Sequence, residues 1–147
     1  MKISIGCDHG GFGLKTAIIA HLKELGHEVL DEGTYNATDS VDYPIFGEKA
    51  ALDVKEGKAD FGIVCCTSGE GIMMAANKVK GIRCGVGYDD VVVEKMREHN
   101  NANMISFGQA YMKTEDVLRR VDIFLKTPFA GGRHERRVNE ISDIENK

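Results

Sequence analysis

The sequence predicts an α/β fold in which a parallel sheet is covered on both faces by helices. Short apolar runs alternate about five times with longer segments of helical period, which is the order of elements that crossover connections between parallel strands produce. Polar, glycine-containing turns follow several of the apolar runs, as expected where strands end. No repeat, low-complexity segment or linker interrupts this order, so we expect residues 1–147 to form a single domain.

The expected elements follow one another from the N-terminus. Strands are predicted at the apolar runs 2–7, 27–33, 61–66, 82–87 and 103–108, and helices at the periodic segments 14–25, 46–56, 72–79, 89–99 and 115–125. Both prolines, Pro44 and Pro128, are expected in connections. Gly131 and Gly132 interrupt the helical pattern before a final, strongly charged helix. This C-terminal arm, about 128–147, has few apolar residues for a core, and we expect it to pack on another subunit.

Composition narrows the class of partner. The chain has 19 Lys and Arg against 23 Asp and Glu, a net charge of -4, so it lacks the basic surface that nucleic acid or an anionic membrane would require. The four cysteines have neither disulfide-framework nor zinc-site spacing, which favours a reduced, cytoplasmic location. The N-terminus turns polar too early for a signal peptide, and no apolar run is long enough to span a membrane. We therefore expect a small-molecule ligand.

The expected binding site lies at one edge of the sheet. Ligands of open α/β sheets bind outside the carboxyl ends of the strands, near the point where the strand order reverses. In this sequence the strand ends carry the polar turns 7–11, 65–71, 87–90 and 107–110. Parallel strands bring such turns to the same edge, so these residues are candidates for the site.

The loop from Thr67 to Gly71 joins the third strand to the next helix. Its backbone N–H groups and the start of the helix favour an anionic ligand, and Gly69 and Gly71 permit a close approach. Tight strand-to-helix turns also need glycine for geometry alone, so a purely structural role is an equal alternative.

Two adjacent cysteines precede this loop. Cys66, at a helix N-terminus, is suited to act as a thiolate base or nucleophile. Cys65 faces the other side of the strand, and we expect it to pack as a small hydrophobic residue. A carboxylate close to Cys66 would raise the pKa of the thiol, so Glu70 either points to solvent or shares in proton transfer.

Histidines and arginines provide further candidates. Asp8 and His9 follow the first strand, where they could bind substrate hydroxyls and move their protons; alternatively, Asp8 caps the following helix. His99 closes a helix, where compensation of the helix dipole is a simple explanation. Arg133 and Arg137 lie four apart on one helix face and suit a phosphate or carboxylate, with a solvated charged face as the alternative.

Taken together, six motifs give the sequence a specific resemblance. In order, they are "GCDHGG", "VDYP", "GIVCCTSGEG", "AANKVKGIR", "REHNNAN" and "GGRHERRV". With this order over nearly its whole length, the chain closely resembles the type B ribose-5-phosphate isomerase and galactose-6-phosphate isomerase family. The resemblance implies a Rossmann-like three-layer sandwich with a five-stranded parallel sheet. It also implies a homodimer, or a dimer of dimers, with active sites shared between subunits, and aldose-ketose isomerisation through an enediolate with no metal or organic cofactor.

The resemblance implies a role for each matching residue. Cys66 matches the catalytic base, Ser68 a hydroxyl residue that assists proton movement, and His99 the residue that opens the furanose ring. The other matches bind substrate: Asp8, Tyr43 and Asn100; the anion-hole loop residues Thr67, Gly69, Glu70 and Gly71; and the phosphate ligands His9, Arg133 and Arg137, of which the arginines reach across from the neighbouring subunit.

Departures from the family pattern leave the sugar open. Ala110 stands where the family often has an arginine that helps to bind phosphate, while Thr67 and Ser68 replace the usual glycine and threonine. Ribose 5-phosphate is the leading expectation, and a six-carbon sugar phosphate such as allose 6-phosphate or galactose 6-phosphate is the alternative. A non-catalytic sugar-phosphate-binding protein is a minor alternative, because the catalytic set is complete. A redox sensor is also a minor alternative, because Cys65 and Cys66 are adjacent on a strand and could form a disulfide only with strain.

Overall fold

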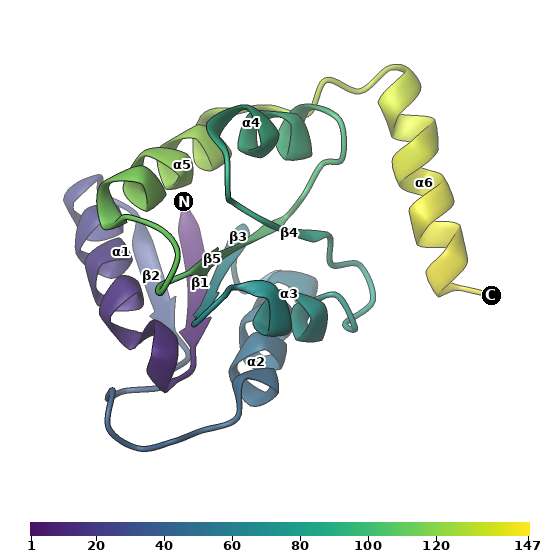
Figure 1. The fold of residues 1–147 in the computed structure, drawn as a ribbon. Helices are drawn as coiled ribbons and strands as arrows, with labels where there is room; N and C mark the ends of the chain where they lie inside the picture. Colours follow the sequence, from purple (N-terminus) through teal and green to yellow (C-terminus); the bar gives the residue numbers. More distant parts are fainter.

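The computed structural model describes residues 1–147 as an α/β sandwich (Figure 1). The strands are β1 (Lys2–Cys7), β2 (Glu28–Asp31), β3 (Phe61–Cys66), β4 (Cys84–Val86) and β5 (Met104–Gly108). The helices are α1 (Phe12–Glu24), α2 (Tyr43–Lys55), α3 (Glu70–Ala76), α4 (Asp90–Glu98), α5 (Thr114–Lys126) and α6 (Arg133–Glu145), with a 3-10 turn, η1 (His9–Gly11), before α1. All five strands are parallel, in the order β2-β1-β3-β5-β4, which confirms the predicted five-stranded parallel sheet.

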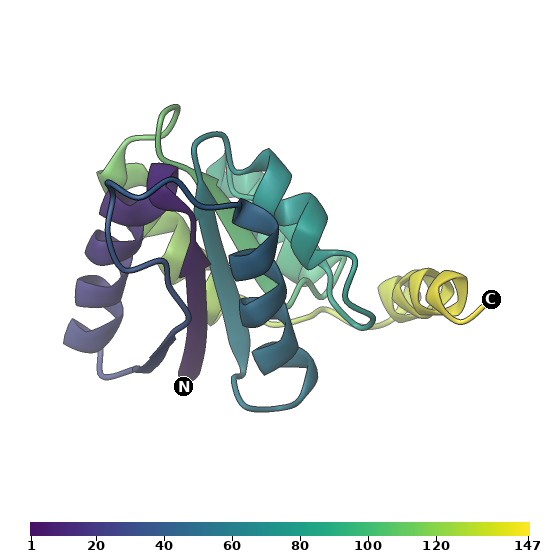
Figure 2. The same cartoon turned by 90° about the horizontal axis from the view of Figure 1, so that it is seen from below.

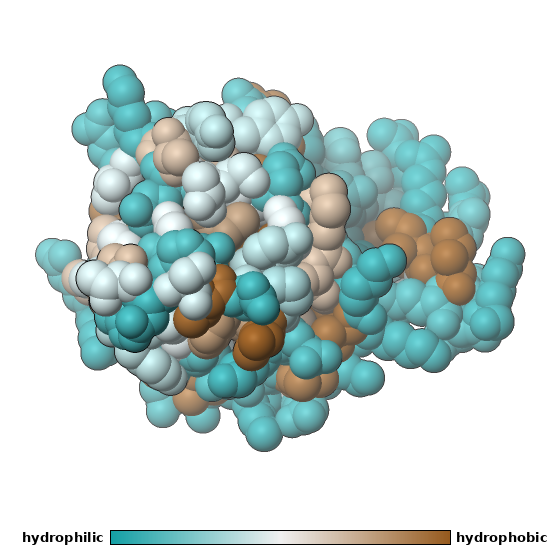
Figure 3. Space-filling model, turned by 60° about the horizontal axis from the view of Figure 1, so that its bottom comes forward, coloured by the Kyte–Doolittle hydropathy of each residue, from teal (hydrophilic) through white to brown (hydrophobic).

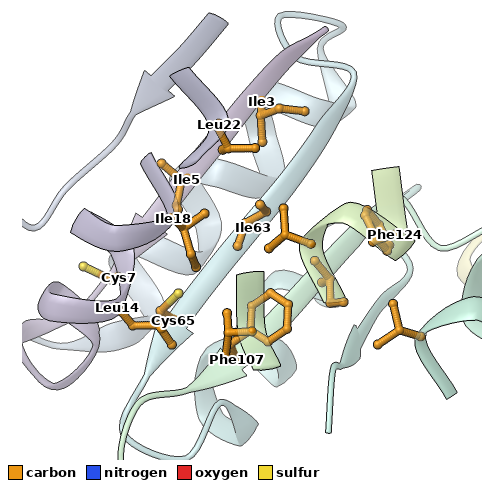
Figure 4. Close-up of a cluster of buried hydrophobic side chains, with 14 of the residues drawn as sticks. Ile3, Ile5, Cys7, Leu14, Ile18, Leu22, Ile63, Cys65, Phe107 and Phe124 are labelled. Carbon is orange, nitrogen blue, oxygen red and sulfur yellow. The ribbon is translucent and has the colours of Figure 1, made fainter. Parts of the chain in front are cut away.

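The two faces of the sheet form separate apolar cores. The larger core lies against α1, α4 and α5 and contains Cys65 and Phe107 (Figure 4). The smaller core lies against α2 and α3 and contains Val64, Cys66 and Met104. Because successive side chains of a strand point to opposite faces, the two cysteines at the end of β3 belong to different cores.

The strand order changes direction between β1 and β3, which is where open α/β sheets bind ligands. From β1 the chain continues through α1 to β2, and then crosses back through α2 to β3 on the other side of β1. The two helices therefore cover opposite faces (Figure 2). Cys7 pairs with Cys65, so the two strands end side by side, and the turns that follow them meet at one edge.

A buried lysine anchors the long connection between β2 and α2. Lys15 is 1% exposed, and its Nζ lies 2.5 Å from Asp31 Oδ1 and 2.7 Å from the carbonyl oxygen of Thr34. A buried ammonium group requires such partners, because its desolvation is otherwise costly. The ion pair therefore holds the start of the connection against α1 and sets where the rest of it crosses the carboxyl edge.

Two features differ from or extend the expectations. Pro44 lies in the first turn of α2 and not in a connection, because proline is compatible with the first helical positions, whose N–H groups have no intrahelical partner. The final helix forms as predicted and extends away from the sandwich (Figures 1 and 2). It leaves Ile141 and Ile144 exposed, and hydrophobic surface is visible on this arm (Figure 3). None of the helices has the length and apolar character needed to cross a membrane.

A carboxyl pair gives the fold a pH-dependent contact. Glu32 hydrogen-bonds to Asp53, whose Oδ2 also accepts a hydrogen bond of 2.8 Å from Ser4 Oγ. The contact with Asp53, together with burial, raises the pKa of Glu32 from 4.5 to about 7. The folded chain therefore holds this proton more tightly than the unfolded chain. Its stabilising contribution is complete below the unfolded pKa and is lost as the pH rises through the folded value.

We predict that Glu32→Gln flattens the pH dependence of stability. As the pH rises from about 5 to 8, the melting temperature of the unmodified chain should fall relative to that of the variant, because glutamine keeps a hydrogen-bond donor and carries no charge. Thermal unfolding followed by circular dichroism at several pH values measures the difference. Parallel curves for the two proteins would contradict the assignment.

Candidate active site

The loop after β3 donates a backbone N–H to the Cys66 sulfur. Cys66 is 4% exposed, and its Sγ accepts a hydrogen bond of 3.1 Å from Gly69 N–H. Gly69 has φ of 84°, in the left-handed region, which turns the chain from the strand into α3. Its carbonyl oxygen accepts a hydrogen bond of 2.6 Å from Ser106 Oγ on β5, and Ser68 Oγ accepts one of 3.1 Å from Glu70 N–H. Two strands thus hold the loop.

The other cysteines are poorly suited to proton transfer. Burial raises the pKa of Cys65 well above its ordinary value and that of Cys7 to about 12. Burial also raises the pKa of Cys84 strongly. All four cysteines are free, and Cys66 is the one whose sulfur accepts a hydrogen bond from the backbone of the loop after β3. The prediction that Cys65 packs in the core is therefore confirmed. Glu70 is exposed and forms no hydrogen bond to Cys66, so of its two predicted placements it takes the one toward solvent.

Asp8 and His9 lie at the neighbouring strand end. Asp8 is buried, and its Oδ1 accepts a hydrogen bond of 3.1 Å from Gly11 N–H, so the residue does cap the following turn. Its other carboxylate oxygen makes no hydrogen bond in the chain and is free for a ligand. His9 Nδ1 accepts a hydrogen bond of 3.1 Å from Val41 N–H, which places the proton of the neutral ring on Nε2. A donor and an acceptor are therefore available side by side.

Close contacts through glycine join the turns into one surface. A Cβ on Gly71 would lie 2.6 Å from the Tyr43 ring, so this ring packs directly on the backbone of the loop. A Cβ on Gly10 would lie 2.2 Å from Thr67 Oγ1, so the first turn touches the loop as well. The structure thus brings together nine of the predicted site residues: Asp8, His9, Tyr43, Cys66, Thr67, Ser68, Gly69, Glu70 and Gly71.

The remaining predicted residues lie at the opposite edge of the sheet. His99 ends α4 and Asn100 follows it, shortly before β5 begins at Met104, whose partner in the sheet is Gly62 near the start of β3. Cys66 is at the other end of β3, and a strand of this length spans roughly 15–20 Å. Arg133 and Arg137 begin α6, next to the end of α4 (Figure 1). One copy of the chain therefore does not unite the two groups.

The second group contains a residue that the sequence prediction did not include. The ring of His134 stacks on that of His99, with centroids 4.2 Å apart and planes inclined by 12°. Burial lowers the pKa of His134, and the nearby positive groups of His99, Arg133 and Arg137 lower it further. His134 stands between the arginines in the motif "GGRHERRV". The motif indicated that His134 lies near the candidate arginines, but nothing in the sequence indicated its contact with His99.

A hollow of about 420 Å³ lies beside the loop and does not include Cys66. Ser68 and Glu70 line one part of it, and Tyr111 and Lys113 from the turn after β5 line another. Ala110, at the start of this turn, donates its N–H to the Thr67 carbonyl oxygen at 3.0 Å. No three His, Cys, Asp or Glu side chains gather as a metal site would require.

The fold and the site together define a class of protein: an α/β enzyme that acts on a small anionic substrate at the carboxyl edge of a parallel sheet. The comparisons place it further, because the family model described as Ribose/Galactose Isomerase matches residues 3–141. The chain belongs to this family.

Relatives align over almost the whole chain. Ribose-5-phosphate isomerase B of Escherichia coli K12 is 42% identical over 99% of this chain and 97% of that protein. The solved structure of ribose-5-phosphate isomerase B from Clostridium thermocellum is 49% identical, with a TM-score of 0.97 over 99% of this chain and 98% of that one. The Mycoplasma genitalium enzyme, solved with bound ribulose 5-phosphate, is 37% identical with a TM-score of 0.95, over 99% and 97% of the two chains.

We predict that Gly69→Ala damages the site through the backbone. A Cβ there would lie 2.9 Å from the Phe107 carbonyl carbon, and alanine is strained at this φ. We therefore expect the free energy of unfolding to fall by about 1–3 kcal/mol, and turnover to fall more than in a variant with a similar loss of stability away from the site. Chemical denaturation and a turnover assay measure the two effects. Gly57→Ala is the matched control, because Gly57 has φ of 75° with no atom near its Cβ position. Equal turnover losses in both variants would contradict the prediction.

Proposed function

We propose that this chain interconverts ribose 5-phosphate and ribulose 5-phosphate through an enediolate, with Cys66 as the base. The observation that carries the proposal is the Cys66 sulfur held within hydrogen-bond distance of a backbone loop whose N–H groups suit an oxyanion. Family membership and the ribulose 5-phosphate bound to the Mycoplasma genitalium relative support the choice of sugar.

The proposed chemistry uses the loop as a unit. The Cys66 thiolate removes the proton from C2 of the open-chain aldose, and the electron pair forms the enediolate. The same thiol then returns the proton to C1, so no external oxidant or reductant is needed. The Ser68 hydroxyl moves the proton between the two sugar oxygens. Backbone N–H groups of the loop stabilise the enediolate, where loss of one such donor typically costs about 3 kcal/mol.

The residues around the thiol are proposed to orient the sugar. The free oxygen of Asp8 accepts from a hydroxyl, and Nε2–H of His9 donates to the substrate phosphate. Tyr43, exposed to 40%, forms one side of the site, where its ring lies on the loop backbone. Thr67, Glu70 and Gly71 complete the loop that faces the substrate.

We propose that a homodimer, alone or within a dimer of dimers, completes the site. The residues around Cys66 lie at one edge of the sheet, and His99, Asn100, Arg133 and Arg137 lie at the opposite edge of the same copy. A second copy must therefore supply these four residues if both groups act on one sugar. The extended arm, with Ile144 exposed to 67%, supports packing of α6 on a neighbouring subunit. The free thiols agree with a reducing, cytoplasmic setting for this dimer.

One observation favours a six-carbon sugar phosphate as the second candidate. The hollow beside Ser68 provides space for an additional carbon, and Lys113 in its wall forms no ion pair within the chain. Ala110 leaves this side without the family's frequent arginine. Initial rates on ribose 5-phosphate, allose 6-phosphate and galactose 6-phosphate at matched concentrations decide between the candidates. A strong preference for ribose 5-phosphate would exclude the second.

We predict that Cys66→Ala lowers kcat by about 10²–10⁴-fold while the protein stays folded, because it removes the base. Cys65→Ala is the matched control, because the neighbouring thiol lies in the opposite core and should be dispensable for turnover. The rate of ketose formation from ribose 5-phosphate measures the difference. Full turnover by folded Cys66→Ala would eliminate the thiol mechanism.

Subunit complementation tests the shared site. In the forward direction, from ribose 5-phosphate, Cys66→Ala and His99→Leu should each have little activity alone. Mixing them with subunit exchange should restore roughly a quarter of wild-type activity, because half of the dimers are mixed and each mixed dimer has one intact site. Activity of the mixture against mixing ratio is the measurement. No recovery despite proven exchange would mean that each site draws both residues from one chain.

A further inference from the structure

The ring of His99 stacks on one aromatic neighbour, the ring of His134. No hydrogen bond to the imidazole of His99 is formed within the chain, and the parallel ring of His134 at 4.2 Å is its aromatic contact. A side chain at the end of a helix is otherwise free to change rotamer. The orientation of His99 thus depends on a residue from another helix.

Backbone contacts hold His134 in place. The connection from α5 to α6 is fixed to the end of α4 by two hydrogen bonds, from Ala130 N–H to the Glu98 carbonyl oxygen at 3.0 Å and from Arg97 Nε to the Thr127 carbonyl oxygen at 3.1 Å. Gly131 and Gly132, with φ of 66° and 57°, then turn the chain into α6. This path brings His134, in the first turn of α6, against His99 at the end of α4.

The charges around the stack separate the roles of the two histidines. The positive charges of Arg133 and Arg137, on the same helix, act on His134, while Glu98 on α4, whose negative charge opposes them, pairs with Lys95 at 3.0 Å. Two protonated rings in contact would repel, and the positive surroundings oppose a charge on His134. The neutral form of His134 is thereby favoured, because its surroundings lower the pKa of the ring.

We propose that His134 is a positioning residue for the ring-opening step, holding the imidazole of His99 in the plane from which it moves a proton. This rests on the proposed function. In that step the C1 hydroxyl loses a proton, the bond between C1 and the ring oxygen breaks, and the ring oxygen gains a proton. His99 relays the proton, so none is gained or lost overall. His134 does not touch the substrate atoms that react.

Direction of reaction provides a readout that a general structural defect would not produce. Ribose 5-phosphate is mainly a furanose and must open before isomerisation. Ribulose 5-phosphate is open-chain, because the hydroxyl that would close a furanose on its ketone carries the phosphate. A defect confined to ring opening therefore slows the forward reaction and spares the reverse one.

The experiment compares His134→Leu, which loses the aromatic face, with His134→Phe, which keeps it. We expect His134→Leu to lower forward kcat/KM by about tenfold or more, as misplacement of a catalytic group does, with reverse turnover close to wild type. At high enzyme concentration its forward rate should stop rising, because spontaneous ring opening becomes limiting. His134→Phe should restore most of the forward rate, and Glu140→Leu, an exposed position on the same helix, is the control.

Each outcome decides the assignment. Loss of the forward reaction with rescue by phenylalanine supports it. Equal losses in both directions, no loss in His134→Leu, or failure of His134→Phe to rescue would overturn it. A wild-type protein without activity on either sugar phosphate would instead refute the proposed function, which separates the two failures.

Discussion

The parallel pairing of β1 with β3 is the constraint on which the site depends. Cys7 lies beside Cys65 in this ladder, and Asp8 N–H then donates to the Cys65 carbonyl oxygen at 3.3 Å, so the two strands end together. The turns that follow must share the same small space. They do so because Gly10 and Gly11 lack a Cβ, which would overlap Thr67 and the Cys65 backbone. One backbone register thereby places the capping carboxylate and the thiol loop at a common edge.

The two-residue period of β3 explains how adjacent cysteines come to differ. Cys65 enters the larger core, where burial strongly disfavours its charged form, while Cys66 lies on the other face next to the loop. The sulfur that meets a backbone N–H is the one suited to hold negative charge. The two thiols are chemically identical, and orientation alone separates the packing role of Cys65 from the catalytic role proposed for Cys66.

Separation of the site residues into two groups follows from the same architecture. Parallel strands gather strand ends at one edge and helix ends at the other, so His99 at the end of α4 lies a strand length from Cys66. The first turn of α6 brings Arg133 and His134 to the second group, and the rest of that helix extends outward (Figure 2). This separation is the structural reason for proposing that a second copy of the chain completes the site.

The sequence by itself determined the class of fold and most of the candidate site residues at the carboxyl edge of the sheet. Apolar periodicity placed all five strands and the helices to within a few residues, because period and burial are local properties of the chain. It also identified Cys66 and its loop. Only the tertiary structure revealed the contact between His99 and His134, the carboxyl pair of Glu32 and Asp53, and the burial of Lys15. Each of these joins residues from separate elements, and their distance and desolvation arise only when helices pack, which no local pattern in the sequence encodes.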